Sequence, residues 1–516
     1  MRSAGSRTGW RPRKTTPVPL TTLVARADGR LIGDAAAAGT TVTGATLRAQ
    51  DVRQGDLFAA LPGARAHGAD FAQEALAAGA AAVLTDPDGV ERPSLLDADV
   101  PILVHPDPRG VLGEVAAWIY GEPSLHLAVL GITGTSGKTT TAYLVESGLA
   151  EAGKTTGLVG TVETRIAGER LASAFTTPEA PDLQALFAVM LEQGVTHVPM
   201  EVSSHALSLG RVNGTRFSVG AFTNLSQDHL DFHRDMAEYF ATKSILFDGR
   251  STTEVVIIDS AWGQALLAPH TITVALDEGT GAEWTASDIT STPTGEQAFV
   301  LRGPGDVAIS TKLPLPGEFN VANALLAAAI LDACGVEPAQ IAAGLASVRV
   351  PGRMERVNQG QEFTAVVDYA HKPAAVALAL DALRAQTTGK VITVLGCGGD
   401  RDTGKRPLMG EAAVRRSDVL IVTDDNPRSE DAAAIRASML AGARAVGAVH
   451  GGEVLEIADR GEAIRHAVSL AVPGDTVFIA GKGHETGQDV GGVKHPFSDR
   501  DELAAALRIH VEGGTR

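Results

Sequence analysis

The sequence predicts an α/β protein whose parallel β-sheets are divided among three domains. Its 516 residues exceed what one hydrophobic core usually organises. Short apolar runs that end in polar or glycine-rich loops alternate with helix-compatible segments along most of the chain. This alternation is typical of parallel sheets covered by helices on both faces, which bind ligands beyond the carboxyl ends of their strands.

The pattern forms three blocks, for which we predict domains over residues 18–123, 124–350 and 351–516, behind a disordered basic tail at residues 1–17. The predicted strands share an apolar centre and a polar or glycine end. In chain order they cover residues 56–62, 81–85, 101–105, 127–133, 197–202, 219–224, 254–259, 365–368, 391–396, 418–424 and 476–481.

Composition limits the classes of function. The formal net charge of −17 argues against a wide nucleic-acid surface, which needs clustered positive charge, but a few basic or metal sites can still bind small anions. No run of about 18 apolar residues predicts a membrane span. Two cysteines, Cys334 and Cys397, fit a reducing compartment, and the basic N-terminus lacks the apolar stretch of a secretion signal. We therefore expect a cytoplasmic protein.

A glycine-rich loop between a predicted strand and a predicted helix is the first motif that carries chemistry. The run LAVLGITGTSGKTTT places Gly134 and Gly137 before Lys138 and Thr139. In such loops backbone N–H groups approach phosphate oxygens, the lysine contacts the outer phosphates, and the threonine hydroxyl is a ligand of Mg²⁺. The loop is shorter than G-x-x-x-x-G-K-[ST], whose first glycine would fall on Ile132. It predicts nucleotide binding and leaves kinase, ATPase, GTPase and ligase activity open.

A second group of polar residues follows the next two predicted strands. Glu201 ends one strand and His229 follows the other, so both could lie beside a triphosphate and hold Mg²⁺. The string D-H-x-D-x-H that starts at Asp228 also resembles the ligand set of a binuclear zinc hydrolase, although the upstream phosphate loop argues against that class. For Asp231 and His233, capping and local hydrogen bonding are as good an interpretation as a direct role.

Ten motifs occur in the order found in the Mur ligase family, which the chain resembles over nearly its whole length after the basic tail. They are TGTSGKTT, MEVSSH, NLSQDHLDFH, YFATKSILF, GEFNVANALLA, PGRMERV, DYAHKP, GCGGDRDTGKRP, DDNPR and GKGHE. The resemblance implies a small N-terminal α/β domain that binds UDP, a central P-loop ATPase domain with a parallel sheet, and a C-terminal Rossmann-like domain that binds the amino acid.

The resemblance also implies an activity. It predicts an ATP-dependent ligase of peptidoglycan synthesis, and so of cell shape and division. This ligase adds meso-diaminopimelate to the D-Glu side-chain carboxylate of UDP-MurNAc-L-Ala-D-Glu, and releases ADP and phosphate. The expected partners are these small molecules, without nucleic acid, and the expected state is a monomer. Because a carboxylate is a poor acyl electrophile, the γ-phosphoryl group would first form an acyl phosphate. His205 and His229 are both candidates for the base that deprotonates the amine.

The family's site residues map onto this sequence position by position. The implied catalytic residues are Lys138, Glu201, His229 and Lys243, and Lys243 is expected to carry a CO₂-derived carbamate. The implied Mg²⁺ ligands are Thr139, Glu201, His229 and the Lys243 carbamate. The implied ATP contacts are Gly134, Thr135, Ser136, Gly137, Lys138, Thr139, Thr140, Asn320, Asn323, Arg353 and Asp368. Composition and spacing alone do not single out Lys243.

Two further sets concern the other substrates. The implied contacts of the UDP-sugar peptide are Leu47, Ala49, Thr176, Thr177, Ser203, Leu209 and Arg211. The chain departs from the family pattern at Ala49, where serine is usual, at Leu209, where some members carry glutamine, and at Ser136, which replaces a common asparagine. The implied diaminopimelate contacts are Arg406, Asp425, Asn426, Pro427, Arg428, Gly481 and Glu485.

Diaminopimelate differs from lysine by one additional carboxylate, so a selective pocket should present a fixed guanidinium such as Arg428, while Glu485 suits an ammonium group. A lysine-adding relative would not be expected to carry that arginine. A folylpolyglutamate synthetase shares the ATP domain, but the additional N-terminal domain with its GDLFAALPG stretch favours a muramoyl substrate. An inactive scaffold is disfavoured because the implied catalytic residues are intact.

Overall fold

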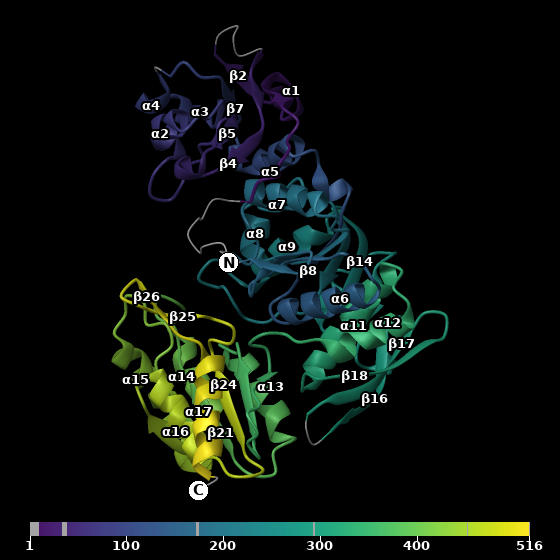
Figure 1. The fold of residues 1–516 in the computed structure, drawn as a ribbon, viewed down its shortest axis with the longest axis vertical. Coiled ribbons are helices and arrows are strands. Elements are labelled where there is room, and N and C mark those ends of the chain that lie inside the picture. The colour runs from purple at the N-terminus through teal and green to yellow at the C-terminus, as the bar shows by residue number, and fades with distance from the viewer. Residues whose placement is uncertain are drawn as a thin grey trace.

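The structure is a computed structural model that describes residues 10–33, 39–96, 98–171, 175–292, 295–450 and 452–514. Three domains follow one another along the chain, and Figure 1 shows the first at the top, the central one in the middle and the third at the lower left. Each is built on its own sheet. The predicted three-domain α/β class is confirmed, and every predicted strand overlaps a strand of the structure. Within the described residues no helix is long and apolar enough to cross a membrane.

The first domain has a five-stranded sheet in the order β2-β7-β6-β5-β4, parallel except for β2 at its edge. In that order the strands span Arg30–Ile32, Ile102–Val104, Ala82–Thr85, Asp56–Ala59 and Gly44–Thr46. The helices are α1 (Leu20–Arg26), α2 (Ala72–Ala77), α3 (Pro87–Val90), α4 (Pro93–Leu96) and α5 (Pro108–Ile119). A short ladder of β1 (Val18–Pro19) and β3 (Thr41–Val42) joins the chain's start to this domain.

The basic tail is attached to the first domain by Arg11. Its guanidinium donates to the Asp56 carboxylate at 2.7 Å and also contacts the Tyr120 hydroxyl. The prediction of a disordered tail over residues 1–17 therefore fails from Arg11 on, because a buried carboxylate needs a counter-charge. Residues 1–9 lie outside the described part of the chain.

The central sheet has eight strands in the order β11-β10-β9-β12-β8-β13-β14-β15. In that order they span Glu169–Leu171, Thr164–Ile166, Gly157–Val159, His197–Glu201, Ala128–Thr133, Phe217–Phe222, Ser251–Ile257 and Ile272–Val274. Neighbours from β9 to β15 are parallel, whereas β9, β10 and β11 pair antiparallel. The parallel strands place their carboxyl ends, and the loops that follow them, along one edge.

Helices cover both faces of the central sheet. The largest apolar core joins one face to α6 (Lys138–Glu151), α11 (Glu318–Ala333) and α12 (Pro338–Ser347). On the other face α7 (Ala180–Glu192) packs against Val129, Val198 and Met200. The shorter helices are α8 (Ser204–Ser208), α9 (Met236–Ser244) and α10 (Ala261–Gln264).

A three-stranded antiparallel sheet, which the sequence analysis did not predict, extends the central domain at the lower right of Figure 1. It consists of β16 (Thr285–Ser291), β17 (Gln297–Gly303) and β18 (Val307–Leu313). Along β18, buried residues alternate with exposed or half-buried ones, so the sheet covers the core beside α11 with one face only. A search for continuous apolar runs overlooks strands of this kind, because their apolar residues recur at every second position.

The third domain has a six-stranded sheet in the order β19-β20-β24-β21-β22-β23, parallel except for β19. The strands span Glu355–Arg356, Thr364–Asp368, Thr476–Ala480, Val391–Leu395, Val419–Val422 and Glu453–Glu456. One core packs α13 (Pro373–Arg384), α14 (Lys405–Val414) and α15 (Ala432–His450) on one face. The other core packs α16 (Arg460–Leu470) and α17 (Asp499–Gly514) on the opposite face. A hairpin of β25 (Gly487–Val490) and β26 (Val493–Pro496) stands beside the sheet.

A fully buried ion pair fastens α16 to α17. The side chains of Arg460 and Asp499 are 0% exposed, and two guanidinium nitrogens donate to the two carboxylate oxygens at 2.7 and 2.8 Å. Arg460 also donates to the carbonyl oxygens of Ala480 at 2.8 Å and Asp424 at 3.3 Å. It therefore holds the carboxyl ends of β24 and β22, from which the predicted amino-acid motifs emerge.

Candidate active site

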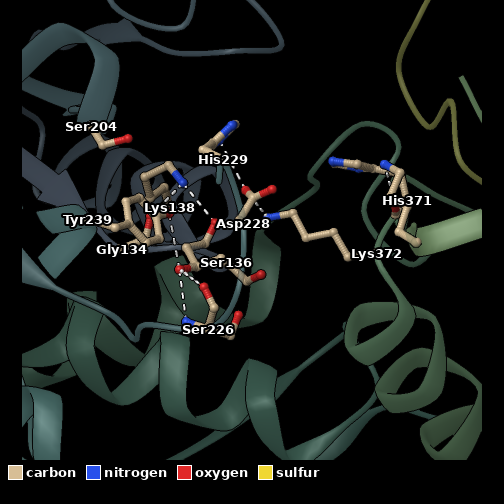
Figure 2. A network of polar contacts seen from close by, with 12 residues as sticks. Gly134, Ser136, Lys138, Ser204, Ser226, Asp228, His229, Tyr239, His371 and Lys372 are labelled. Atoms are coloured by element: carbon tan, nitrogen blue, oxygen red, sulfur yellow. Dashed lines mark hydrogen bonds and ion pairs between the residues drawn. The ribbon is translucent and has the colours of Figure 1, made fainter. Parts of the chain in front are cut away.

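The phosphate loop follows β8 in the middle of the central sheet. Its backbone turns at Gly134 and Gly137, whose φ angles are 140° and 89°, and α6 starts at Lys138. The Lys138 ammonium folds back and donates to the carbonyl oxygens of Gly134 at 2.8 Å and Thr135 at 2.9 Å (Figure 2). Burial, with a smaller contribution from the nearby Lys372, lowers the pKa of Lys138 to about 8. The loop and helix N-terminus have the geometry that binds phosphate.

Neighbouring side chains brace this loop from outside. The Asn224 amide accepts from the Ser136 backbone N–H at 3.1 Å and donates to the Ser136 carbonyl at 3.2 Å. The Thr135 hydroxyl lies 3.2 Å from the Tyr239 hydroxyl, and Thr140 is buried on the first turn of α6. Ser136 thus shapes the loop through its backbone, which any residue type supplies.

Asn320 and Asn323 lie on α11 and are both buried. Asn323 donates to the Asn320 side-chain oxygen at 3.2 Å, and Asn320 donates to the Pro316 carbonyl at 2.8 Å. A methyl group placed on Gly137 would come within 2.4 Å of the Asn323 side-chain oxygen. The asparagine pair is therefore in direct contact with the phosphate loop, as a role in nucleotide binding requires.

Substituting Gly137 by alanine is expected to weaken nucleotide binding by about tenfold or more. The left-handed conformation costs an L-residue about 1–2 kcal/mol, and the added methyl group would also displace Asn323. Titration calorimetry with ATP measures the effect. Gly153→Ala is the matched control, because Gly153 also has a positive φ, 69°, but has no atom within 4 Å of the added group. Equal loss of affinity in both variants would contradict the role of this close packing.

Thr139 and Glu201 meet beside the phosphate loop, where the central domain faces the third domain. The Thr139 hydroxyl donates to Glu201 at 3.0 Å, and the Thr161 backbone N–H donates to the same oxygen at 2.8 Å. Glu201 is 2% exposed at the end of β12. Arg353, which precedes the third sheet, donates to the Thr139 hydroxyl at 3.1 Å and stacks on the Tyr369 ring. The structure thus brings together a hydroxyl, a carboxylate and a guanidinium that the sequence assigned to ATP and Mg²⁺.

Asp368 holds the backbone turn next to Arg353. It ends β20 and accepts from the backbone N–H groups of Met354 and Ala370, each at 2.7 Å. Burial raises the pKa of this carboxyl, while Arg353 and the backbone donors lower it. Asp368 therefore fixes the turn that carries Arg353 into the cleft.

Lys243 is the most unusual lysine of the central domain. It is 1% exposed on α9, donates to the Gly134 carbonyl at 2.9 Å and lies over the Tyr239 ring. Burial lowers its pKa well below the usual range, and Lys138 and Lys372 lower it further. Burial therefore favours the neutral amine over the ammonium beside the phosphate loop. A neutral amine is the form that reacts with CO₂, so the surroundings fit the predicted carbamate.

His229 stands at the mouth of the cleft with a positive φ of 53°. Its ring nitrogen lies 3.0 Å from the Asp228 carboxylate, which also pairs with Lys372 at 2.6 Å (Figure 2). Burial lowers the pKa of His229 to about 4. Burial also opposes ionisation of Asp228, but Lys372 and His229 outweigh it and hold its pKa well below the usual range. The imidazole is neutral, which is the form that ligates metals.

The remaining histidines of this region are placed differently. His205 stacks on Phe232 at 4.1 Å and meets the His229 ring edge-on at 4.9 Å, so both candidate bases share one side of the cleft. His233 is buried and hydrogen-bonded to the Ser204 hydroxyl at 3.0 Å, which is a packing role. Within the described residues, no group of three or more His, Cys, Asp or Glu side chains that could hold a metal ion is found.

The predicted sugar-peptide residues fall into two groups. Thr177 donates to the Glu201 backbone carbonyl at 2.8 Å and accepts from the Ser203 N–H at 3.2 Å, while Thr176 hydrogen-bonds to the Thr161 hydroxyl. Arg211 donates to the Thr177 carbonyl at 3.3 Å. These four predicted residues thus form one hydrogen-bonded cluster at the end of β12, which Thr177 joins to the Glu201 backbone.

Of the remaining three residues, Leu47 and Ala49 lie apart in the first domain, whereas Leu209 lies on the segment between Ser203 and Arg211. Leu47 and Ala49 belong to cores of the first domain, and Ala49, on a 3-10 turn, is buried. A buried alanine presents no hydroxyl where the family's serine would stand. Leu209 ends α8 beside Gly210. The structure describes no contact between Leu47 or Ala49 and the Thr177 cluster.

The predicted amino-acid residues gather at the carboxyl ends of β22 and β24. Asn426 donates to Glu485 at 2.9 Å, and the fully buried Lys482 donates to Asn426 at 2.9 Å and to Glu485 at 2.8 Å. Asp425 lies 3.9 Å from the Lys482 ammonium and close to Gly481. Lys482 was missed as a site residue although it lies inside the GKGHE motif. The Lys482 ammonium orients the Glu485 carboxylate through this hydrogen bond.

The two predicted arginines have different surroundings. Arg406 is 5% exposed and donates to both oxygens of Glu430, at 2.8 and 2.9 Å. Arg428 is half-buried, donates to the Gly399 carbonyl and adopts a φ of 53°, which its hydrogen bonds to Asp489 and Gly491 hold in place. A left-handed arginine held this way is typical of a functional position. Arg406 already has an internal partner, so Arg428 is the better candidate for a ligand carboxylate.

Comparison with known proteins identifies the family. The model "Mur ligase family, catalytic domain" matches residues 41–120, "Mur ligase middle domain" matches residues 132–331, and "Mur ligase, glutamate ligase domain" matches residues 352–483. The UDP-N-acetylmuramoyl-L-alanyl-D-glutamate–2,6-diaminopimelate ligase of Corynebacterium efficiens is 54% identical over 464 residues, which is 88% of each chain. The chain belongs to the Mur ligase family.

Two further relatives extend the match over almost the full Mur ligase chain. The protein of the same name from Streptomyces coelicolor is 52% identical over 504 residues, covering 96% of this chain and 98% of its own. A solved structure of a ligase with that name superposes with a TM-score of 0.68 at 30% identity, over 96% of this chain and all of the other. The resemblance drawn from the ten motifs is therefore confirmed for the family and for the three-domain fold.

Proposed function

We propose that the chain is an ATP-dependent ligase that adds meso-diaminopimelate to the D-Glu side-chain carboxylate of UDP-MurNAc-L-Ala-D-Glu in peptidoglycan synthesis. The observation that carries the proposal is the contact of Thr139 at the phosphate loop with both Glu201 and Arg353 of the third domain. Asn426 and Glu485 meet beyond the ends of β22 and β24 of that domain's sheet. The names of the relatives at 54% and 52% identity support the same substrates.

ATP would bind with its phosphates against the loop between β8 and α6. Backbone N–H groups of the loop and the N-terminus of α6 face the phosphates, and Lys138 can exchange its two loop carbonyls for phosphate oxygens. Arg353 would add a guanidinium from the third domain. These residues orient the γ-phosphoryl group and neutralise its charge, which is most of what phosphoryl transfer demands of a protein.

The donor set fits Mg²⁺. The Thr139 hydroxyl and Glu201 carboxylate, 3.0 Å apart, offer hard oxygen ligands beside the phosphate loop, and His229 is held neutral nearby. A bound Mg²⁺ would neutralise charge on the phosphates and on the acceptor carboxylate. Lys243 would hold a second ion once its neutral amine has become a carbamate, since that group presents carboxylate-like oxygens at the Gly134 end of the loop.

The chemistry then has two steps, activation of the carboxylate by phosphorylation and attack of the amine on the acyl phosphate. The γ-phosphoryl group moves from ATP to the D-Glu carboxylate, which gives ADP and an acyl phosphate. The diaminopimelate ammonium loses a proton, its amine forms the amide bond, and phosphate leaves. Thr176, Thr177, Ser203 and Arg211, clustered at the end of β12, would hold the acceptor. Burial lowers the pKa of the nearby His205, which favours a neutral imidazole as a candidate base.

The decisive experiment measures phosphate release by the purified protein with ATP, Mg²⁺ and UDP-MurNAc-L-Ala-D-Glu. Diaminopimelate should support turnover, and lysine should be rejected because it leaves Arg428 without its carboxylate partner. Turnover with lysine alone would assign the chain to the lysine-adding relatives. Turnover with a folate and glutamate would overturn the muramoyl substrate.

Arg428→Ala should raise the KM for diaminopimelate about 10- to 100-fold and leave the KM for ATP unchanged. The variant loses charge-assisted hydrogen bonds to a carboxylate, worth about 1.5–3 kcal/mol. Steady-state kinetics with each substrate varied in turn separate the two constants. Arg465→Ala removes an exposed arginine of α16 in the same domain and serves as the control. An unchanged KM for diaminopimelate in Arg428→Ala would remove this residue from the pocket.

A further inference from the structure

Asp228 lies between two cationic or polar groups that come from different domains. One of its carboxylate oxygens is 3.0 Å from the His229 ring nitrogen and 2.6 Å from the Lys372 ammonium. Asp228 belongs to the loop after β13 of the central sheet, whereas Lys372 is the residue before α13 of the third domain. Figure 2 shows Lys372 reaching across the gap to this carboxylate, with His229 on its other side. The Asp228 side chain is 18% exposed and that of Lys372 is 13% exposed.

This contact is an ion pair between the two domains. Among the ion pairs of the described residues, Asp228–Lys372 is the one that joins the central domain to the third domain. Arg353 also crosses, but it donates to a neutral hydroxyl and lies close to the connecting segment. Lys372 is further along the chain, so its position depends on how the third domain is docked.

The neighbours of Lys372 make Asp228 its necessary partner. Burial lowers the pKa of Lys372, Arg353 and Lys405 lower it further, and Asp228 raises it. Lys405 itself donates to the His371 carbonyl next to Lys372. A buried ammonium among these cations is stable only while it has a counter-charge, so removing Asp228 leaves Lys372 in an unfavourable site.

His229 depends on the same carboxylate. Within the described part of the chain, Asp228 is the only polar partner of its ring, whose other neighbours are the rings of His205 and Tyr239. A histidine that ligates a metal is commonly oriented by a carboxylate on its second nitrogen, and loss of that carboxylate typically costs 10- to 100-fold in metal affinity or activity, so about that range applies here.

We propose that Asp228 and Lys372 are positioning residues that couple docking of the third domain to the orientation of His229. When the third domain closes, Lys372 fixes the Asp228 carboxylate, and that carboxylate fixes the imidazole beside the phosphate loop. When the domain opens, the carboxylate is released and the imidazole loses its orientation. The proposal rests on the proposed function for the role of His229, but the link between the domains stands without it.

The test uses Lys372→Met, Asp228→Asn and the double variant of the full chain, with small-angle X-ray scattering in ADP and Mg²⁺ and with turnover under the ligase assay. Both single variants should increase the radius of gyration to the same extent, because each breaks the same link. Turnover should fall about 10-fold in Lys372→Met and up to about 100-fold in Asp228→Asn, which also releases His229. The double variant should match Asp228→Asn, because the two residues act in one chain of contacts.

A charge exchange separates the two parts of the proposal. Asp228→Lys combined with Lys372→Asp should restore the compact form, because the ion pair is re-formed, but should leave turnover low, because a lysine cannot accept from His229. Arg416→Gln is the control, since it breaks an ion pair with Asp381 inside the third domain and should change neither measurement.

Two results would overturn the proposal. If Lys372 acts by binding phosphate, Lys372→Met will raise the KM for ATP without expanding the molecule, and its effect will add to that of Asp228→Asn. If both single variants scatter like the wild type, the ion pair does not hold the domains together. Scattering does not depend on the amino-acid substrate, so failure of the proposed function would instead appear as absent turnover in the wild type.

Discussion

Replacing Asp499 by alanine is expected to destabilise the third domain by about 3–5 kcal/mol, the usual cost of removing one partner from a buried ion pair. The variant would leave the Arg460 guanidinium fully buried with two backbone carbonyl partners and no counter-charge. Because those carbonyls belong to the ends of β22 and β24, the loss should reach the loops that carry Asn426 and Glu485. The effect is therefore expected on both stability and diaminopimelate binding.

Hydrogen exchange of third-domain amides measures this loss without assuming that the three domains unfold as one unit. Asp501→Ala, which removes an exposed carboxylate from the same helix, should leave exchange unchanged. Combining Arg460→Met with Asp499→Leu removes both charges and should recover most of the stability, since apolar replacement of a buried pair is often neutral. If the double substitution is as unstable as Asp499→Ala, packing volume rather than charge is the cause.

Lys243→Ala is expected to lower kcat by about 100- to 1,000-fold, as removal of a preorganised group that stabilises developing charge commonly does. The fold should survive, because the substitution removes a buried amine whose one hydrogen bond is to the Gly134 carbonyl. The cavity left beside the loop can admit a small carboxylic acid, so acetate should restore part of the activity by supplying the oxygens that the carbamate would have offered.

The measurements are kcat, ATP affinity and turnover in buffers depleted of CO₂. ATP affinity should fall far less than kcat, and CO₂ depletion should slow the wild type reversibly. Lys154→Ala, at an exposed lysine of the central domain, should behave like the wild type in all three. Full activity of Lys243→Ala would exclude a carbamate from the mechanism.

Most of the fold could be predicted because the strands of a parallel sheet are continuous apolar runs followed by loops, and such runs are visible in the sequence. The strands within residues 285–313 were not predicted, because one face of their sheet is exposed and they therefore lack continuous apolar runs. The phosphate loop and Glu201 could be predicted for the same reason, because each lies at the end of an apolar strand. Lys243 lies on an ordinary-looking helix, and only the family resemblance pointed to it. Its burial against Gly134 arises from tertiary packing, which no spacing in the sequence reveals.

Contacts between distant segments were beyond prediction for a related reason. Arg460 and Asp499 are 39 residues apart, and Asp228 and Lys372 belong to different domains. A single arginine or aspartate on a helix is usually solvated, so nothing local marks these four residues as partners. Lys482 is intermediate, because it lies inside a recognised motif but only the structure shows its ammonium between Asn426 and Glu485.

Arg460, at the carboxyl ends of β22 and β24, has a consequence for how the choice of amino-acid substrate could change during evolution. Beside its ion pair with Asp499, Arg460 contacts the two loops through main-chain oxygens only. It therefore constrains where the loops begin without regard to which side chains they display. Selection could exchange the side chains of these loops one at a time while the Arg460 contacts keep the loop backbones in place. A cell wall built with a different diamino acid would then require changes in the loops after β22 and β24, not a new domain.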